Sequence, residues 1–210
     1  MSEFRLKAGS ISLVVNCADE LCDQGKWLLE TIKRLHEQGL PLEDKKRIQF
    51  GWTLLTLKRR DSEIVLCEPD YAGNPFSDVV EDVTRTLWVQ AQQVDVLRKL
   101  GLEGSPARFQ DKVVIAKGCL DEPRVFLQRQ GTQEPGDSGW FLGHVQENQD
   151  TGGDYDSLYV YQLLFRRPTF LQVMALPPEY VVVFNGDQIE SILDPQDRAV
   201  WAIDTHGETK

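Results

Sequence analysis

The sequence between residues 180 and 193 constrains the fold more than any other stretch. An apolar run that ends in Val181-Val182-Val183-Phe184 precedes Asn185-Gly186, and a second run, residues 188–193, follows. Asn-Gly between two such runs favours the tight turn of a β-hairpin, because both turn residues need positive φ. The sequence therefore predicts a C-terminal hairpin and, with it, antiparallel pairing.

Other short runs rich in β-branched residues predict further strands at residues 11–15, 48–57, 64–67, 113–116 and 124–127. The apolar run 158–165 favours a buried strand, with a buried helix as the alternative. Two stretches instead repeat apolar residues at helical spacing. One covers residues 21–38. The other is expected to begin at Asn74-Pro75 and to bury a stripe from Phe76 through Val80 and Val94 to Leu97. The prediction is an α+β fold in which a mostly antiparallel sheet packs against two long amphipathic helices.

The segment between residues 101 and 110 is the best candidate for a linker. It contains Gly104 and Pro106 and lacks a periodic apolar pattern. The predicted organisation is an N-terminal α+β half, residues 1–104, and a C-terminal half, residues 105–210. One continuous domain is the alternative.

Charge narrows the classes of partner. The chain has 33 acidic residues against 23 Lys and Arg, a net charge of −10. This balance repels nucleic-acid phosphates and favours a basic protein partner, although it also serves solubility alone. No apolar stretch is long enough for a membrane span or a signal peptide. We therefore expect a cytoplasmic protein that binds neither nucleic acid nor membrane, and the sequence leaves its oligomeric state open.

One motif, Asp137-Ser138-Gly139-Trp140, is similar to the turn that carries the nucleophile in serine proteases. The histidines lack the context of a catalytic base, and Trp140 replaces a glycine that those enzymes need. We interpret the motif as structural: Asp137 and Ser138 bond nearby amides, Gly139 takes a positive φ, and Trp140 enters the core. A hydrolase that uses Ser138 with His144 remains an alternative.

No catalytic residue, cofactor site or metal site is predicted. Cys17 and Cys22 lack a second pair of ligands at zinc-site spacing, and the run of residues 150–156 lacks the spacing of a calcium loop. The sequence has no glycine loop that would hold a phosphate. A module that senses a small ligand is a further alternative.

The Asp137-Ser138-Gly139-Trp140 motif, with residues 158–161, Pro168, Leu176-Pro177 and the hairpin, resembles a bacterial family of immunity-protein domains from polymorphic-toxin systems. The family was formerly a domain of unknown function, and the resemblance covers residues 113–201. It implies a protein without catalysis or cofactor that binds a cognate toxin and neutralises it by occlusion. It also implies interbacterial competition through secreted effectors.

The chain departs from the short members of that family after the tryptophan. Leu142-Gly143-His144-Val145 follows where those members have acidic residues, and the acids come later, from residue 147 to residue 156. If the toxin is basic, a nuclease for example, four of them are the candidate contacts: Glu147, Asp150, Asp154 and Asp156. A solvated loop is the alternative for this segment.

Overall fold

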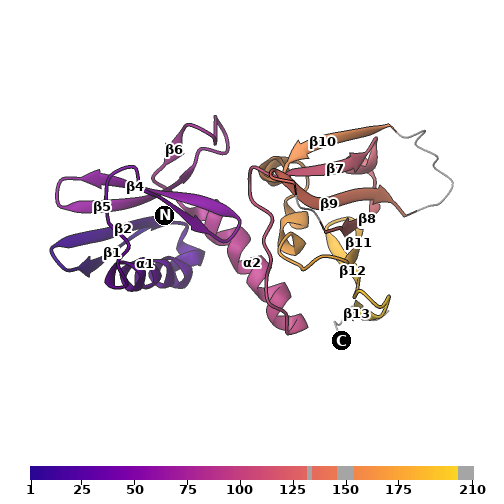
Figure 1. The fold of residues 1–210 in the computed structure, drawn as a ribbon, viewed down its shortest axis with the longest axis horizontal. Helices are drawn as coiled ribbons and strands as arrows, with labels where there is room; N and C mark the ends of the chain where they lie inside the picture. The colour runs from indigo at the N-terminus through magenta and orange to yellow at the C-terminus, as the bar shows by residue number, and fades with distance from the viewer. Residues whose placement is uncertain (132–133, 146–153, 203–210) are drawn as a thin grey trace. The chain divides into compact units, whose positions relative to one another are not determined.

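The computed structural model describes residues 1–131, 134–145 and 154–202. Contacts divide the chain into two compact units, Met1–Ala91 and Gln92–Lys210, each with its own sheet (Figure 1). The fold is α+β. The sequence predicted one mostly antiparallel sheet, whereas the described residues form two mixed sheets, each mostly antiparallel with one parallel pair of strands.

The first unit is built on a sheet with the strand order β1-β2-β5-β4-β3. The strands are β1 Ser2–Ala8, β2 Ile11–Cys17, β3 Arg47–Phe50, β4 Thr53–Arg60 and β5 Glu63–Pro69, and the short β6 Val79–Val80 pairs with β5. Strands β2 and β5 are parallel, whereas the other neighbours are antiparallel. The short 3-10 helix η1, Asp19–Leu21, leads from β2 into helix α1, Cys22–Glu37.

Helix α1 forms where the helical spacing of apolar residues predicts it. Leu28, Leu29 and Ile32 are buried in the core between the helix and the sheet. A Cβ on Gly25 would lie 3.0 Å from the Sγ of Cys17, so a side chain here would push the helix away from β2. The glycine therefore permits the close approach of α1 to the sheet.

Helix α2, Thr84–Leu100, begins later than the sequence suggested. Asn74 closes a turn instead, and its Oδ1 accepts the N–H of Phe76 at 3.1 Å. The β-branched pair that follows forms β6 and completes a ladder with β5. The helix starts only after Asp82, whose Oδ1 accepts the N–H of Thr84 at 2.9 Å, as an N-cap does.

The predicted pair of long amphipathic helices on one sheet is therefore wrong. Helix α1 packs on β1 and β2, whereas the boundary between the two units falls within α2. Phe76, expected in the buried stripe, lies outside the helix, and Val94 is 49% exposed. Because the apolar residues of α2 pack against different parts of the chain along the helix, they do not all lie on one amphipathic face.

The first turn of α2 lies against a buried carboxylate. Glu68, on β5, is 3% exposed. Its Oε2 accepts the N–H of Thr86 at 2.7 Å. Nearby, the Tyr71 hydroxyl lies 2.5 Å from Oγ1 of Thr53, and the Tyr71 ring stacks on Trp52. Burial raises the pKa of Glu68 to about 8, and the bonds from Thr86 oppose that shift only in part.

The second unit contains the sheet β10-β7-β9-β8-β11-β12-β13. Its strands are β7 Lys112–Ala116, β8 Arg124–Arg129, β9 Asp137–His144, β10 Tyr155–Tyr159, β11 Val181–Asn185, β12 Gln188–Leu193 and β13 Ala199–Ala202. Strands β7 and β9 are parallel and the other neighbours antiparallel. The predicted hairpin is confirmed: β11 and β12 pair around Gly186, which has φ 59°.

Short helices connect the strands of this unit: η2 Cys119–Asp121, η3 Val160–Gln162, α3 Leu163–Arg166 and η4 Pro168–Val173. The apolar run 158–165 is therefore not one strand. It leaves β10 at Tyr159 and turns into η3 and α3. On η4, the Phe170 ring packs 4.6 Å from the ring of Phe184 on β11, so this segment covers one face of the sheet.

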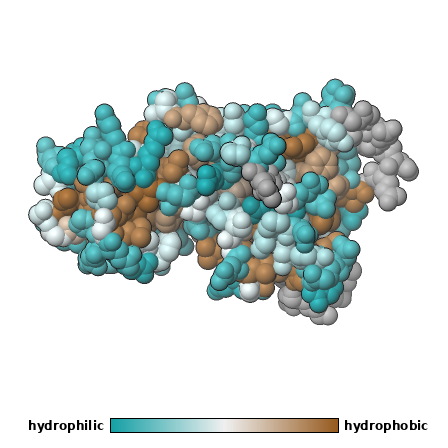
Figure 2. All heavy atoms as spheres, in the orientation of Figure 1, coloured by the Kyte–Doolittle hydropathy of each residue, from teal (hydrophilic) through white to brown (hydrophobic). Residues whose placement is uncertain are grey.

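The two faces of the second sheet differ in burial. Residues that alternate along the strands, such as Val113, Leu127 and Val182, are buried on the covered face. The residues between them are half-buried or exposed and form what we call the outer face: Val114, Phe126, Phe141, Tyr155, Val181 and Val183. Figure 2 shows that hydrophobic residues reach the surface in both units among hydrophilic ones.

Candidate functional site

The Asp137-Ser138-Gly139-Trp140 motif forms a bulge at the start of β9. Lys112 pairs with Asp137 and Val114 pairs with Phe141, so one residue of β7 faces three residues of β9. Gly139 has φ 74°, a conformation that costs glycine little. The motif is therefore part of the sheet, and it lies where the parallel pair β7–β9 begins.

Two side chains hold the bulge. Oδ1 of Asp137 accepts the N–H of Gly139 at 2.8 Å. Oγ of Ser138 accepts the N–H of Trp140 at 3.1 Å and donates to the carbonyl of Lys112 at 2.6 Å. The carboxylate and the hydroxyl thereby replace the ladder bonds that the extra residues interrupt.

Trp140 points into the covered face and is 1% exposed. The guanidinium of Arg129, its partner on β8, lies 5.8 Å from the centre of the indole ring. Arg129 Nη1 also donates to the carbonyls of Ser105 and Leu176. Burial lowers the pKa of Arg129. Arg129 thus ties two chain segments to the tryptophan, a role that its inward place in the alternation of β8 could have indicated.

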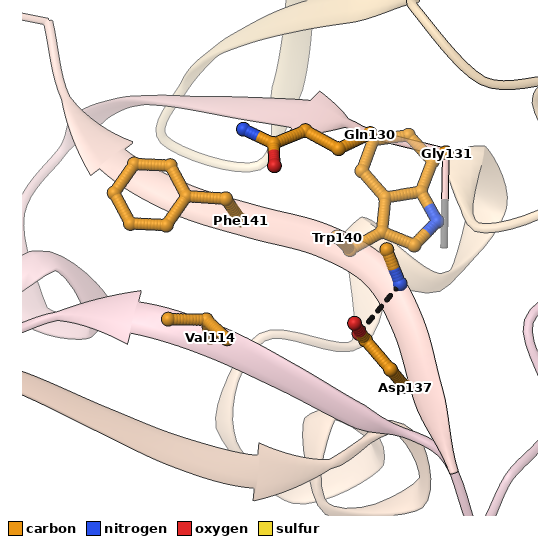
Figure 3. A pocket seen from close by; sticks show the side chains of 7 residues that line it. Val114, Gln130, Gly131, Asp137, Trp140 and Phe141 are labelled. Carbon is orange, nitrogen blue, oxygen red and sulfur yellow. Dashed lines mark hydrogen bonds between the residues drawn. The ribbon is translucent and has the colours of Figure 1, made fainter. Parts of the chain in front are cut away.

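A depression of about 160 Å³ lies beside the bulge (Figure 3). It is lined by Val114, Gln130, Gly131, Asp137, Gly139, Trp140 and Phe141. The N–H of Gln130 donates to the carbonyl of Gly139 at 2.8 Å, which fixes the wall between β8 and β9. The depression therefore combines apolar side chains with one carboxylate.

Aromatic rings continue from the depression across the outer face. The ring of Phe141 lies 5.8 Å from that of Phe126 and 5.9 Å from that of Tyr155. A Cβ on Gly143 would meet a ring carbon of Phe126 at 2.5 Å, so glycine makes room for the cluster. The sequence alone did not predict this cluster, because the three rings come from three strands whose pairing leaves no local signal.

The two predicted acidic contacts that the structure describes, Asp154 and Asp156, lie away from the bulge. Glu147 and Asp150 fall outside the described residues. Asp154 precedes β10 and pairs with Lys117 at 3.3 Å. Asp156 lies on β10 opposite Ile115 of β7 and lines a second depression of about 150 Å³ with Asp121 and Arg166. β7 separates both acids from the bulge.

Ser138 and His144 do not form a catalytic pair. They lie at opposite ends of β9, roughly 15–20 Å apart at the rise of an extended strand. Nδ1 of His144 lies 2.9 Å from Oε1 of Glu122, and Nε2 lies 3.2 Å from the carbonyl of Lys117. Ser138 bonds to Lys112 and Trp140, whereas His144 lies against Glu122 and Lys117. The hydrolase alternative that paired them is therefore wrong.

The part of the chain that the structure describes shows no cluster of metal-ligating side chains. Within the same residues, no helix is both long and apolar enough to cross a membrane.

Comparison with known proteins relates the second unit to one family. Searches of curated proteins and of solved structures gave no match. Residues 92–195, just under half of the chain, match the family model of the Imm33-like domain. The match includes the bulge, the depression and the outer face. The part of the chain that carries the candidate site is therefore similar to the Imm33-like domain, which suggests an immunity-protein family.

Proposed function

We propose that the chain is an immunity protein that binds a cognate antibacterial toxin and neutralises it by occlusion. The observation that carries this proposal is the match of residues 92–195 to the Imm33-like domain. An immunity protein of this kind acts as a stoichiometric inhibitor, so it needs a complementary surface and no reacting group. It would act in the cytoplasm of the cell that produces it.

The charge of the chain supports a basic toxin, with a nuclease as one candidate. A net charge of −10 attracts a basic partner and speeds encounter. Glu147, Asp150, Asp154 and Asp156 remain the proposed contributors to that attraction. Asp154 already pairs with Lys117, so a toxin would compete for its carboxylate.

The two depressions described above do not fit the alternative of a small-molecule sensor. Pockets that bind drug-sized ligands measure about 300 to 1,000 Å³. The two depressions described above measure about 160 and 150 Å³. They are large enough for a side chain of a partner, which favours protein binding.

The test is genetic and uses the host that encodes the chain. We expect deletion of the gene to make cells lose in contact-dependent competition with their parent, and plasmid-borne expression to restore survival. A matched plasmid that carries an early stop codon is the control. If the deletion strain competes as well as its parent under conditions in which that parent kills other sensitive strains, the proposed function is wrong.

A further inference from the structure

The outer face of the second sheet has the chemical character of a binding surface. Val114 is 39% exposed and Tyr155 is 58% exposed, although both are large apolar or aromatic residues on strands. In the view of Figure 2, hydrophobic atoms reach the surface over the part of this unit where Figure 1 labels β7 and β9. Contiguous exposed apolar residues on a sheet, rimmed by polar ones, are typical of protein interaction sites.

The depression offers a place for an anchor residue. It opens beside Phe141 and Val114, and its volume of about 160 Å³ suits one side chain. The bond from Asp137 to the N–H of Gly139 also fixes its floor, so a partner does not have to order it. Buried anchor side chains in preformed pockets carry most of the energy of many interfaces.

The carboxylate of Asp137 adds a charge requirement. Asp137 is exposed and lines the depression. Its Oδ1 accepts the N–H of Gly139, and within the described residues no Lys, Arg or His forms an ion pair with it. The nearest cation along the ladder, Lys112, lies over the ring of Tyr159. The negative charge is therefore free to meet a cation from another molecule.

We propose that the outer face is the surface on which the toxin docks. An apolar side chain of the toxin enters the depression between Val114 and Phe141, and a neighbouring Lys or Arg pairs with Asp137. This inference rests on the proposed function and names its interface. A second copy of the chain is the weaker occupant, because it carries the same net charge of −10 and repels the first.

The experiment replaces outer-face residues and measures protection. Val114→Lys and Tyr155→Lys place a charge in the apolar surface, and Asp137→Asn removes the carboxylate charge while keeping an oxygen for the N–H of Gly139. Two matched controls carry the same change elsewhere: Val79→Lys, where the parent residue is also 39% exposed, and Trp27→Lys, where it is 52% exposed. Each variant is expressed in the deletion strain, and thermal unfolding of the purified chain verifies folding.

We expect Val114→Lys and Tyr155→Lys to lower survival in competition by at least about tenfold, as loss of an interface anchor does. Asp137→Asn should weaken protection less, and the controls should protect like the parent chain. If Val114→Lys fails to fold, Val114→Ser and Tyr155→Lys carry the same comparison.

Two results would overturn the proposal while leaving the proposed function intact. In one, folded Val114→Lys and Tyr155→Lys chains protect fully. In the other, sedimentation shows that the parent chain is a dimer and that Val114→Lys is a monomer, so that the outer face joins two copies. If instead the unchanged chain fails to protect the deletion strain, the proposed function fails, and this interface fails with it.

Discussion

Replacing Glu68 by glutamine should stabilise the protein at neutral and alkaline pH. The carboxylate lies in the core at the first turn of α2, and burial raises its pKa from 4.5 to about 8. The folded state therefore keeps a proton that the unfolded state releases above pH 4.5. The contribution of Glu68 to the free energy of unfolding is therefore fully present below pH 4.5 and is lost as pH rises through about 8.

The size of the effect follows from the shift. Each pKa unit corresponds to about 1.4 kcal/mol, so a shift from 4.5 to about 8 corresponds to at most roughly 5 kcal/mol. The amide in Glu68→Gln would keep the shape of the side chain and an oxygen for the N–H of Thr86, yet it cannot ionise. At pH 8 we expect the variant to be more stable by a few kcal/mol, and near pH 4.5 we expect the difference to vanish.

Urea unfolding of both chains between pH 4.5 and 8, followed by circular dichroism, measures this difference. Ionisable groups elsewhere act equally in both chains, so the difference isolates Glu68. Glu81→Gln is the control of opposite sign, because bonds from Lys58 and then Arg60 lower the pKa of Glu81. Glu81→Gln should be a little less stable than the parent chain, and this difference should be nearly complete at pH 4.5 and stay constant up to pH 8. A difference for Glu68→Gln that stays constant with pH would refute the reasoning.

Three further changes test the second unit. Trp140→Ala should destabilise the chain by about 3 to 5 kcal/mol in urea unfolding, because it empties a buried site; unchanged stability would contradict the role of the indole in the core. Ser138→Ala should cost about 1 to 3 kcal/mol through its two lost hydrogen bonds and leave protection in competition nearly intact; loss of protection with normal stability would contradict this. Gly143→Ala should cost about 1 to 3 kcal/mol by forcing Phe126 to move, and an unchanged melting temperature would show that the ring yields freely.

Local signals predicted the elements whose partners are near in sequence. Asn185-Gly186 sufficed for the β11–β12 hairpin, and the spacing of Leu28 and Ile32 sufficed for α1. The start of α2 was missed, because Asn74-Pro75 and Asp82 both offer acceptable caps. Only the pairing of Val79-Val80 with β5 decides between them, and that contact is tertiary.

The candidate site was predicted in part. Local chemistry pointed to the residues that form the bulge, Asp137 to Trp140. The outer face was not predicted, since Phe126, Phe141 and Tyr155 meet only through the order of four strands. Whether residues 1–104 and 105–210 are separate domains stays a prediction, as do the toxin contacts of the acidic segment.

The position of β9 has a consequence for how the second unit is assembled during synthesis. Strand β9 lies between β7 and β8, both of which precede it in the chain. A nascent chain that has emerged only as far as Arg129 therefore holds two strands that are not neighbours in the final sheet. β7 and β8 can join the sheet only after residues 137–144 have been synthesised, and the bulge at Asp137 is the first part of β9 to leave the ribosome. Substitutions there should slow folding in the cell, because non-local strand pairing limits the rate, even where the finished protein tolerates them.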